Sequence, residues 1–155
     1  MHFVKLLNKL IVDYQGDIYL GNNNYNNLSV NTVRKKIGFS SSENKVFSGT
    51  LYDNLMVFKP TDEKIRLLDE IVKDGILNNL LQTMDYGFDT VLYENGSKLS
   101  EGQKQTISFC RTLLSSKNIL IFDEGFSNID SDTEEKLLQF IFKKFKISCL
   151  FSSKY

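Results

Sequence analysis

Two acidic residues follow the most continuous apolar run of the sequence. Residues 118–122 are an asparagine and four apolar side chains, and Asp123 and Glu124 come directly after them. Such a run is typical of a parallel strand that is buried on both faces, and open parallel sheets bind ligands outside the carboxyl ends of their strands. One carboxylate there could hold Mg²⁺, and the second could orient or deprotonate a water molecule. A strand followed by two solvated acids is the simpler alternative.

A second candidate site lies upstream, where Ser100 and Gly102 open a predicted helix. The backbone N–H groups at a helix N-terminus favour an anion, above all a phosphate. Serine is also a common N-cap residue that needs no ligand. Taken alone, this segment is therefore interpreted as an ordinary helix start, and not as a phosphate site.

Together the two features resemble the ATP-binding cassette (ABC) family, in which a signature motif, a helix, a Walker B strand and a D-loop follow one another. The segments that match are residues 99–103 for the signature motif, 119–124 for the Walker B strand, 127–130 for the D-loop, 37–39 with 46–55 for the Q-loop region of exporter-type, bacteriocin-exporter-like cassettes, and 87–91 with 94–96 for the segment that faces the transmembrane domains. The resemblance extends over residues 5–153, nearly the whole chain.

The resemblance implies ATP and Mg²⁺ as cofactors. In the family, two cassettes dimerise head to tail, so that each ATP lies between one phosphate loop and the signature motif of the opposite cassette. The implied roles are metal binding for Asp123, catalysis through the attacking water for Glu124, and nucleotide contact across the dimer for Ser100, Gly102, Gln103 and the D-loop residue Asp130. Glu101 stands where the family usually has its first glycine, and a carboxylate near a phosphate is unfavourable unless it points away.

Several family features are expected to be missing. A phosphate-gripping loop needs Gly-x-x-x-x-Gly-Lys-Ser/Thr, but none of the nine glycines is followed by lysine. The loop is therefore expected at or before Met1, together with the N-terminal β-subdomain. Ser42 stands where the family has the Q-loop glutamine, and Ser153 where it has the switch histidine. The chain is expected to end short of the family's last elements.

The predicted fold class is α/β: a partial P-loop NTPase-type fold of the ABC ATPase kind, with a parallel sheet core and an α-helical subdomain, and without the N-terminal β-subdomain. We expect residues 1–155 to form one partial nucleotide-binding domain, in which 1–49 and 97–155 are the α/β core and about 50–96 the helical subdomain. Hydrophobic periodicity and cap residues predict the following elements: helices at 5–14, 29–36, 100–115 and from Ser131 onward; a helical stretch at 50–84; and strands at 17–20, 37–39, 118–122 and 147–151. The side chains expected on the buried helix faces include Leu10, Ile107, Cys110, Leu137, Ile141 and Phe142.

Composition excludes several classes of function. The 19 Lys and Arg balance the 19 Asp and Glu, and this balance gives no electrostatic basis for binding nucleic acid. No apolar run approaches the roughly 18 residues that span a bilayer. The sequence has a single histidine, His2, which argues against a histidine-based catalytic triad or a metal site built from several histidines. Cys110 and Cys149 are far apart in apolar stretches, and we expect two reduced, buried thiols.

Two hypotheses for the function stay open. In the first, the chain is the distal part of an ABC transporter ATPase domain, at the cytoplasmic face of the membrane beside a transmembrane domain. It would complete the ATP site of a second nucleotide-binding domain that has an intact phosphate loop, while hydrolysing negligible ATP by itself. In the second, it is a non-catalytic interaction module or the remnant of a split or shortened transporter gene. The missing phosphate loop and the serines at positions 42 and 153 together favour the second hypothesis. The acidic pair at 123–124 and the D-loop at 127–130 favour the first.

Overall fold

A three-stranded parallel sheet lies at the centre of the chain. The structure is a computed structural model that describes residues 2–11, 13–40, 45–57, 59–123, 126–145 and 148–151. The sheet contains β3 (Ile37–Ser40), β6 (Ile119–Asp123) and β7 (Ser148–Phe151) in the order β3-β6-β7. In this register Leu120 pairs with Gly38 on one side and with Ser148 on the other. The predicted parallel α/β sheet is confirmed.

The central strand β6 divides the hydrophobic core into two clusters. Leu120 and Phe122 belong to the larger cluster, whereas Ile121 belongs to a smaller one. Because successive side chains of a strand point to opposite faces, β6 is a wall with apolar packing on both sides. All three side chains are at most 1% exposed, which confirms the sequence-based prediction of a strand buried on both faces.

The larger cluster is enclosed by helices. These are α3 (Leu51–Leu55), α4 (Asp62–Lys73), α5 (Asn78–Leu81), α6 (Glu101–Leu113) and α7 (Ser131–Lys144). Helix α6 packs directly on the sheet, where the rings of Phe109 and Phe122 stack with their centroids 4.5 Å apart. The short antiparallel pair β4 (Gly49–Thr50) and β5 (Val91–Leu92) and the 3₁₀ turns η2 (Gly87–Asp89) and η3 (Glu94–Gly96) complete this part of the chain.

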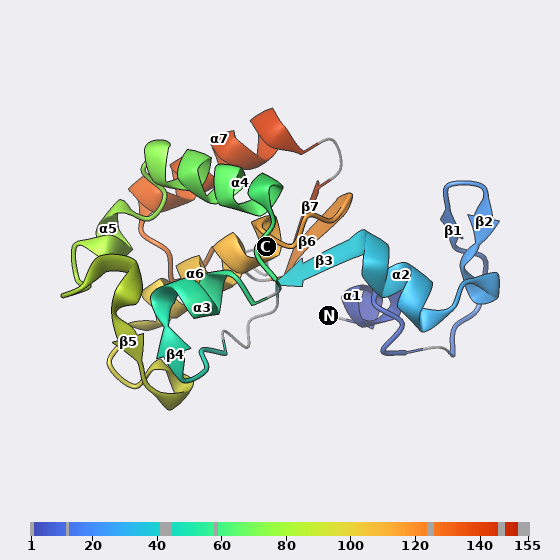
Figure 1. Ribbon diagram of the computed structural model, residues 1–155. Helices are drawn as coiled ribbons and strands as arrows, with labels where there is room; N and C mark the ends of the chain where they lie inside the picture. Colours follow the sequence, from blue (N-terminus) through green and yellow to red (C-terminus); the bar gives the residue numbers. More distant parts are fainter. Residues whose placement is uncertain are drawn as a thin grey trace.

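The remaining elements form an N-terminal unit that packs on the smaller cluster. The unit comprises α1 (His2–Leu7), β1 (Tyr19–Leu20), β2 (Asn23–Asn24), η1 (Tyr25–Asn27) and α2 (Val30–Lys36). Figure 1 shows it, in blue, at one end of the molecule, while α3 to α7 gather at the other end. Its buried hydrophobic residues are Tyr25 and Val33, which pack with Ile37 and Ile121 of the sheet. Helix α2 begins after the N-cap residue Ser29, as the sequence predicts.

The helix predicted at 5–14 is wrong in both position and length. Helix α1 ends at Leu7, and Lys9 follows it with a φ of 51°. This left-handed conformation cannot continue a right-handed helix. Leu10, expected on the buried face, is 58% exposed.

The start and the apolar face of α7 also differ in detail from the prediction. Its N-cap residue is Asp130, whose carboxylate accepts a hydrogen bond from the Thr133 backbone N–H at 3.0 Å, so the helix is capped one residue before Ser131. Leu137 and Ile141 are buried as expected, but Phe142 is 69% exposed. Within the described parts of the chain, no helix has the length and apolar character to cross a membrane.

Candidate functional site

The first turn of α6 is closed by a reciprocal pair of hydrogen bonds. The Ser100 hydroxyl oxygen accepts from the Gln103 backbone N–H at 3.2 Å, and the Gln103 side-chain oxygen accepts from the Ser100 N–H at 2.9 Å. This capping box satisfies two of the N–H groups that a helix start leaves without partners. It also fixes the conformation of both side chains.

Gly102 lets a neighbouring loop approach this turn more closely than any other residue would. A Cβ atom at position 102 would lie 2.2 Å from the carbonyl oxygen of Asn128. The Asn128 N–H in turn donates to the side-chain oxygen of Gln105 at 3.2 Å. Asn128, in the loop before α7, therefore lies against α6 through two contacts. Gly102 leaves room for its carbonyl oxygen, and the buried Gln105 side chain binds its N–H.

Asp130 ends this loop, and its carboxylate accepts hydrogen bonds from two donors. Its Oδ1 accepts from the Thr133 N–H and, at 2.9 Å, from the side-chain amide of Asn79 in α5. Asn79 also donates to the Thr133 hydroxyl at 3.3 Å. Burial acts to raise the pKa of Asp130, but the hydrogen bonds from Thr133 and Asn79 outweigh it and leave the pKa below its ordinary value. Asp130 is therefore ionised near neutral pH.

These residues meet at one cavity of about 250 Å³. Four of the six residues singled out from the sequence line it, namely Ser100, Gly102, Gln103 and Asp130. Sequence reasoning missed the other side chains, because no motif marks them and only the packing of α5 and α7 against α6 brings them there. They are Asn79, Leu80, Thr106, Asn128 and Thr133.

The side chain of Glu101 points away from this cavity. It is 64% exposed and forms an ion pair with Lys104, with Nζ 2.8 Å from Oε1. The expected conflict between a carboxylate in this turn and a bound phosphate is therefore avoided, because the charge is directed toward solvent and partly neutralised by its neighbour.

Of the two acids that follow the apolar run, the structure describes only Asp123. Asp123 ends β6, is 8% exposed, and is absent from the described residues that line the cavity. Glu124 lies outside the described residues, as do Ser42 and Ser153. No cluster of three or more His, Cys, Asp or Glu side chains suited to a metal is found among the described residues. Mg²⁺ usually takes one or two carboxylates and completes its shell with phosphate oxygens and water, and a single buried aspartate suits that mode.

The cavity offers both donors and an acceptor to a ligand. Because the Ser100 oxygen accepts the cap hydrogen bond, its own hydroxyl proton is left to donate. Helix α6 has 13 residues, and the backbone N–H groups of its first turn form the positive end of the helix dipole, which attracts an anion. The ionised Asp130 carboxylate also lines the cavity and supplies the acceptor. Phosphate oxygens fit the first set, and hydroxyl or amide donors of a ligand or an opposing chain fit the second.

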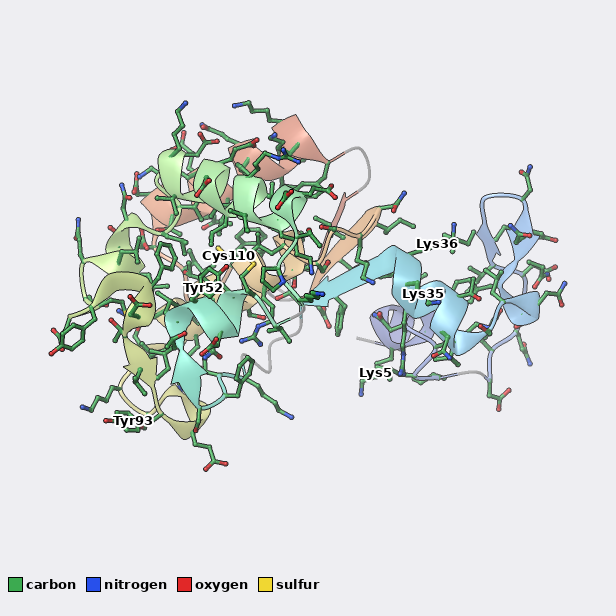
Figure 2. The ribbon with its side chains drawn as sticks, viewed as in Figure 1. Lys5, Lys35, Lys36, Tyr52, Tyr93 and Cys110 are labelled. Carbon is green, nitrogen blue, oxygen red and sulfur yellow. The ribbon has the colours of Figure 1, made fainter. Side chains whose placement is uncertain are left out.

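The other end of α6 is anchored to the segment that follows β3. The Arg111 guanidinium donates to the carbonyl oxygens of Asn54 and Lys45 at 2.8 and 3.0 Å. The fully buried Asn54 amide bridges the same segment by bonding the N–H and the carbonyl of Phe47. Cys110 beside it is fully buried, which raises the pKa of its thiol to about 12, so it is no nucleophile at neutral pH. Figure 2 shows Cys110 within the helical part of the molecule.

Comparison with known proteins gives consistent matches. Residues 2–127 match the family model described as ABC transporter. The chain is 33% identical over 138 residues to an uncharacterized ABC transporter ATP-binding protein of Sinorhizobium fredii, a match that covers 88% of this chain and 23% of that protein. It is 31% identical over 138 residues to the pediocin PA-1 transport/processing ATP-binding protein of Pediococcus acidilactici, covering 85% of this chain and 19% of the relative.

A third relative is the mitochondrial iron-sulfur clusters transporter of Homo sapiens, 31% identical over 137 residues that cover 87% of this chain and 18% of the transporter. The chain thus spans about a fifth of the length of these curated relatives. Among solved structures, a bacterial Atm1-family ABC exporter with ATP bound matches with a TM-score of 0.84 and 22% identity, covering 97% of this chain and 27% of that one. At this identity the likeness concerns the fold alone.

Proposed function

The chain belongs to the ABC transporter family, and from this premise we propose that it acts in the ATP-binding domain of an exporter-like transporter. Its cavity at the start of α6 faces an ATP molecule that is held by the phosphate loop of a second cassette. The chain thereby completes that cassette's ATP site. The domain works at the cytoplasmic face of a membrane, beside a transmembrane domain that carries the transported substrate.

One observation carries this proposal. Ser100, Gly102 and Asp130, which are separated by up to thirty positions in the sequence, line the same cavity, and Gly102 is the contact that draws the loop before α7 onto α6. A helix start by itself would be satisfied by its capping box. Here the helix start, a close-approach glycine and an ionised aspartate converge, which supports a site built to face a polyanion across an interface.

The acids after β6 would serve a nucleotide held by the chain's own side of such an interface. Asp123 would hold Mg²⁺, which neutralises phosphate charge when bound, and Glu124 would orient the attacking water. The export and transport functions printed in the names of the relatives support a transporter as the setting. They leave the substrate of this chain unassigned.

The test uses the 155-residue chain and an exporter cassette that has an intact phosphate loop but a disabled signature serine. We expect ATP hydrolysis only in the mixture. Ser100→Asp keeps an N-cap acceptor but removes the hydroxyl donor and adds a negative charge at the cavity, so it should lower the rate by about a hundredfold. Glu101→Gln is the matched control, since its side chain lies in the same turn and points to solvent.

Different outcomes separate the candidate functions. Turnover in the mixture that Ser100→Asp does not reduce would contradict the proposed role of the cavity. Association with the cassette in the absence of any turnover would favour a non-catalytic interaction module. If neither association nor nucleotide binding is detected, the chain is better explained as the remnant of a split or shortened transporter gene.

A further inference from the structure

Two polar side chains of one short segment contact two of the residues that line the cavity. Asn79 lies in α5 and donates to the Asp130 carboxylate at 2.9 Å. Thr83, in the turn directly after α5, accepts a hydrogen bond from the Gln103 side-chain amide at 2.9 Å. The two positions are four apart, yet they reach the loop before α7 and the first turn of α6 respectively.

The segment that carries them is anchored in the larger core cluster. Leu77 and Leu80 are at most 2% exposed, so the backbone between them cannot shift without disturbing buried packing. Asn79 and Thr83 themselves are exposed, and Asn79 lines the cavity. An apolar anchor with a polar outer face is a suitable support for side chains that must keep a fixed orientation.

The direction of each hydrogen bond is determined by the surrounding partners. The Thr83 hydroxyl donates to the Leu80 carbonyl at 2.8 Å, which leaves its oxygen free to accept from Gln103. The Gln103 side-chain oxygen accepts from the Ser100 N–H, while its amide nitrogen donates to Thr83. The two donor hydrogens of Asn79 go to Asp130 and Thr133. The Thr83 hydroxyl and the side-chain amides of Gln103 and Asn79 therefore each have a single orientation that satisfies these hydrogen bonds.

Resting on the function proposed above, we infer that Asn79 and Thr83 are positioning residues of the ATP site. They hold Asp130 and Gln103 against the walls of the cavity, in the orientation in which these side chains face the opposing nucleotide. Neither Asn79 nor Thr83 touches the reacting atoms. The hydrogen bond from Asn79 also favours the ionised form of Asp130.

The variants replace the hydrogen-bonding atoms and keep the shape. Asn79→Asp exchanges the donor amide for a carboxylate beside Asp130. Asn78→Asp is its control, because it makes the same chemical change one residue earlier, outside the residues that line the cavity. Thr83→Val removes the hydroxyl at constant shape, and Thr83→Ser restores it.

The first measurement is made on the chain alone. A carbon-13 NMR titration should show the Asp130 pKa rise in Asn79→Asp relative to wild type, and stay in place in Asn78→Asp. A role of Asn79 in stability alone would change the melting temperature without this local shift. An unchanged Asp130 pKa in a folded Asn79→Asp variant would contradict the inferred contact.

The second measurement is ATP turnover in the mixture with the cassette used above. We expect Asn79→Asp and Thr83→Val each to lower kcat by about tenfold or more, with the KM for ATP unchanged because the opposing loop binds it. Thr83→Ser and Asn78→Asp should behave as wild type. Turnover equal to wild type in both Asn79→Asp and Thr83→Val would overturn the inferred positioning role and leave the proposed function intact. If the wild-type chain itself gives no turnover in the mixture, the proposed function fails, and the positioning role fails with it.

Discussion

At the scale of single residues, neighbouring positions of one helical turn face opposite requirements. Gly102 is pressed against a backbone carbonyl, whereas the Glu101 side chain extends into solvent and pairs with Lys104. The first position therefore has no room for even a methyl group, and the second accepts a long charged side chain. This difference explains how the chain carries a glutamate in a turn that the family usually builds from glycines.

We predict that Gly102→Ala lowers the free energy of unfolding by about 1–3 kcal/mol, since the added Cβ would lie 2.2 Å from the Asn128 oxygen and force the loop away. The helix propensity of alanine, which exceeds that of glycine, works in the opposite direction by about 1 kcal/mol. Urea denaturation measures the change. Glu101→Ala, in the same turn, should stay within about 0.5 kcal/mol of wild type. Equal stability of the two variants would refute the close approach.

At the scale of elements, the sequence predicts best those helices whose signals are local. The serine caps of α2 and α6 and the apolar face of α6 are short-range patterns, and the structure confirms them. The helix expected at 5–14 fails because Lys9 adopts a left-handed conformation that periodicity does not reveal. Asn79 and Thr83 were missed because their partners lie 51 and 20 positions away, across contacts that only tertiary packing creates.

The N-cap of α7 gives a pH-dependent prediction. The pKa of Asp130 is lowered in the folded state despite burial, so its ionised form contributes stability above the unfolded aspartate pKa of about 3.9. That contribution is lost as the pH falls through the lower, folded-state pKa. Asp130→Asn keeps a side-chain cap acceptor but does not titrate.

Urea denaturation from pH 2.5 to pH 7 measures this contribution. The difference in unfolding free energy between wild type and Asp130→Asn should be constant above about pH 5 and should decline toward lower pH. A difference that is independent of pH over this range would show that the hydrogen bonds from Thr133 and Asn79 do not favour the carboxylate.

At the scale of the whole molecule, two core clusters of unequal size share the strand β6. The N-terminal unit rests on four buried residues, Tyr25, Val33, Ile37 and Ile121, whereas the cluster enclosed by α3 to α7 is several times larger. Less buried apolar area gives less stabilisation. We therefore expect the N-terminal unit to open before the helical part, in a separate cooperative step.

Native-state hydrogen exchange tests this order of opening. Leu137→Ala, in the larger cluster, should lower the exchange free energy of α6 amides by about 2–5 kcal/mol. It should leave α2 amides unchanged, because they exchange through a state in which Leu137 remains packed. Val33→Ala, in the smaller cluster, should lower both by about 2 kcal/mol. If Leu137→Ala lowers the protection of α2 as much as that of α6, the molecule opens as one unit.

The capping box at the start of α6 also affects how such a chain changes over generations. Ser100 and Gln103 close the helix end through their own hydrogen bonds, so selection for a folded protein favours a capping side chain at position 100 and its partner at position 103, even in a lineage that has stopped binding nucleotide. Selection on folding gives no such protection to a hydrogen bond that serves only orientation, as between Thr83 and Gln103. Genetic drift after a loss of activity would therefore remove the hydroxyl at position 83 before it removes the capping side chain at position 100.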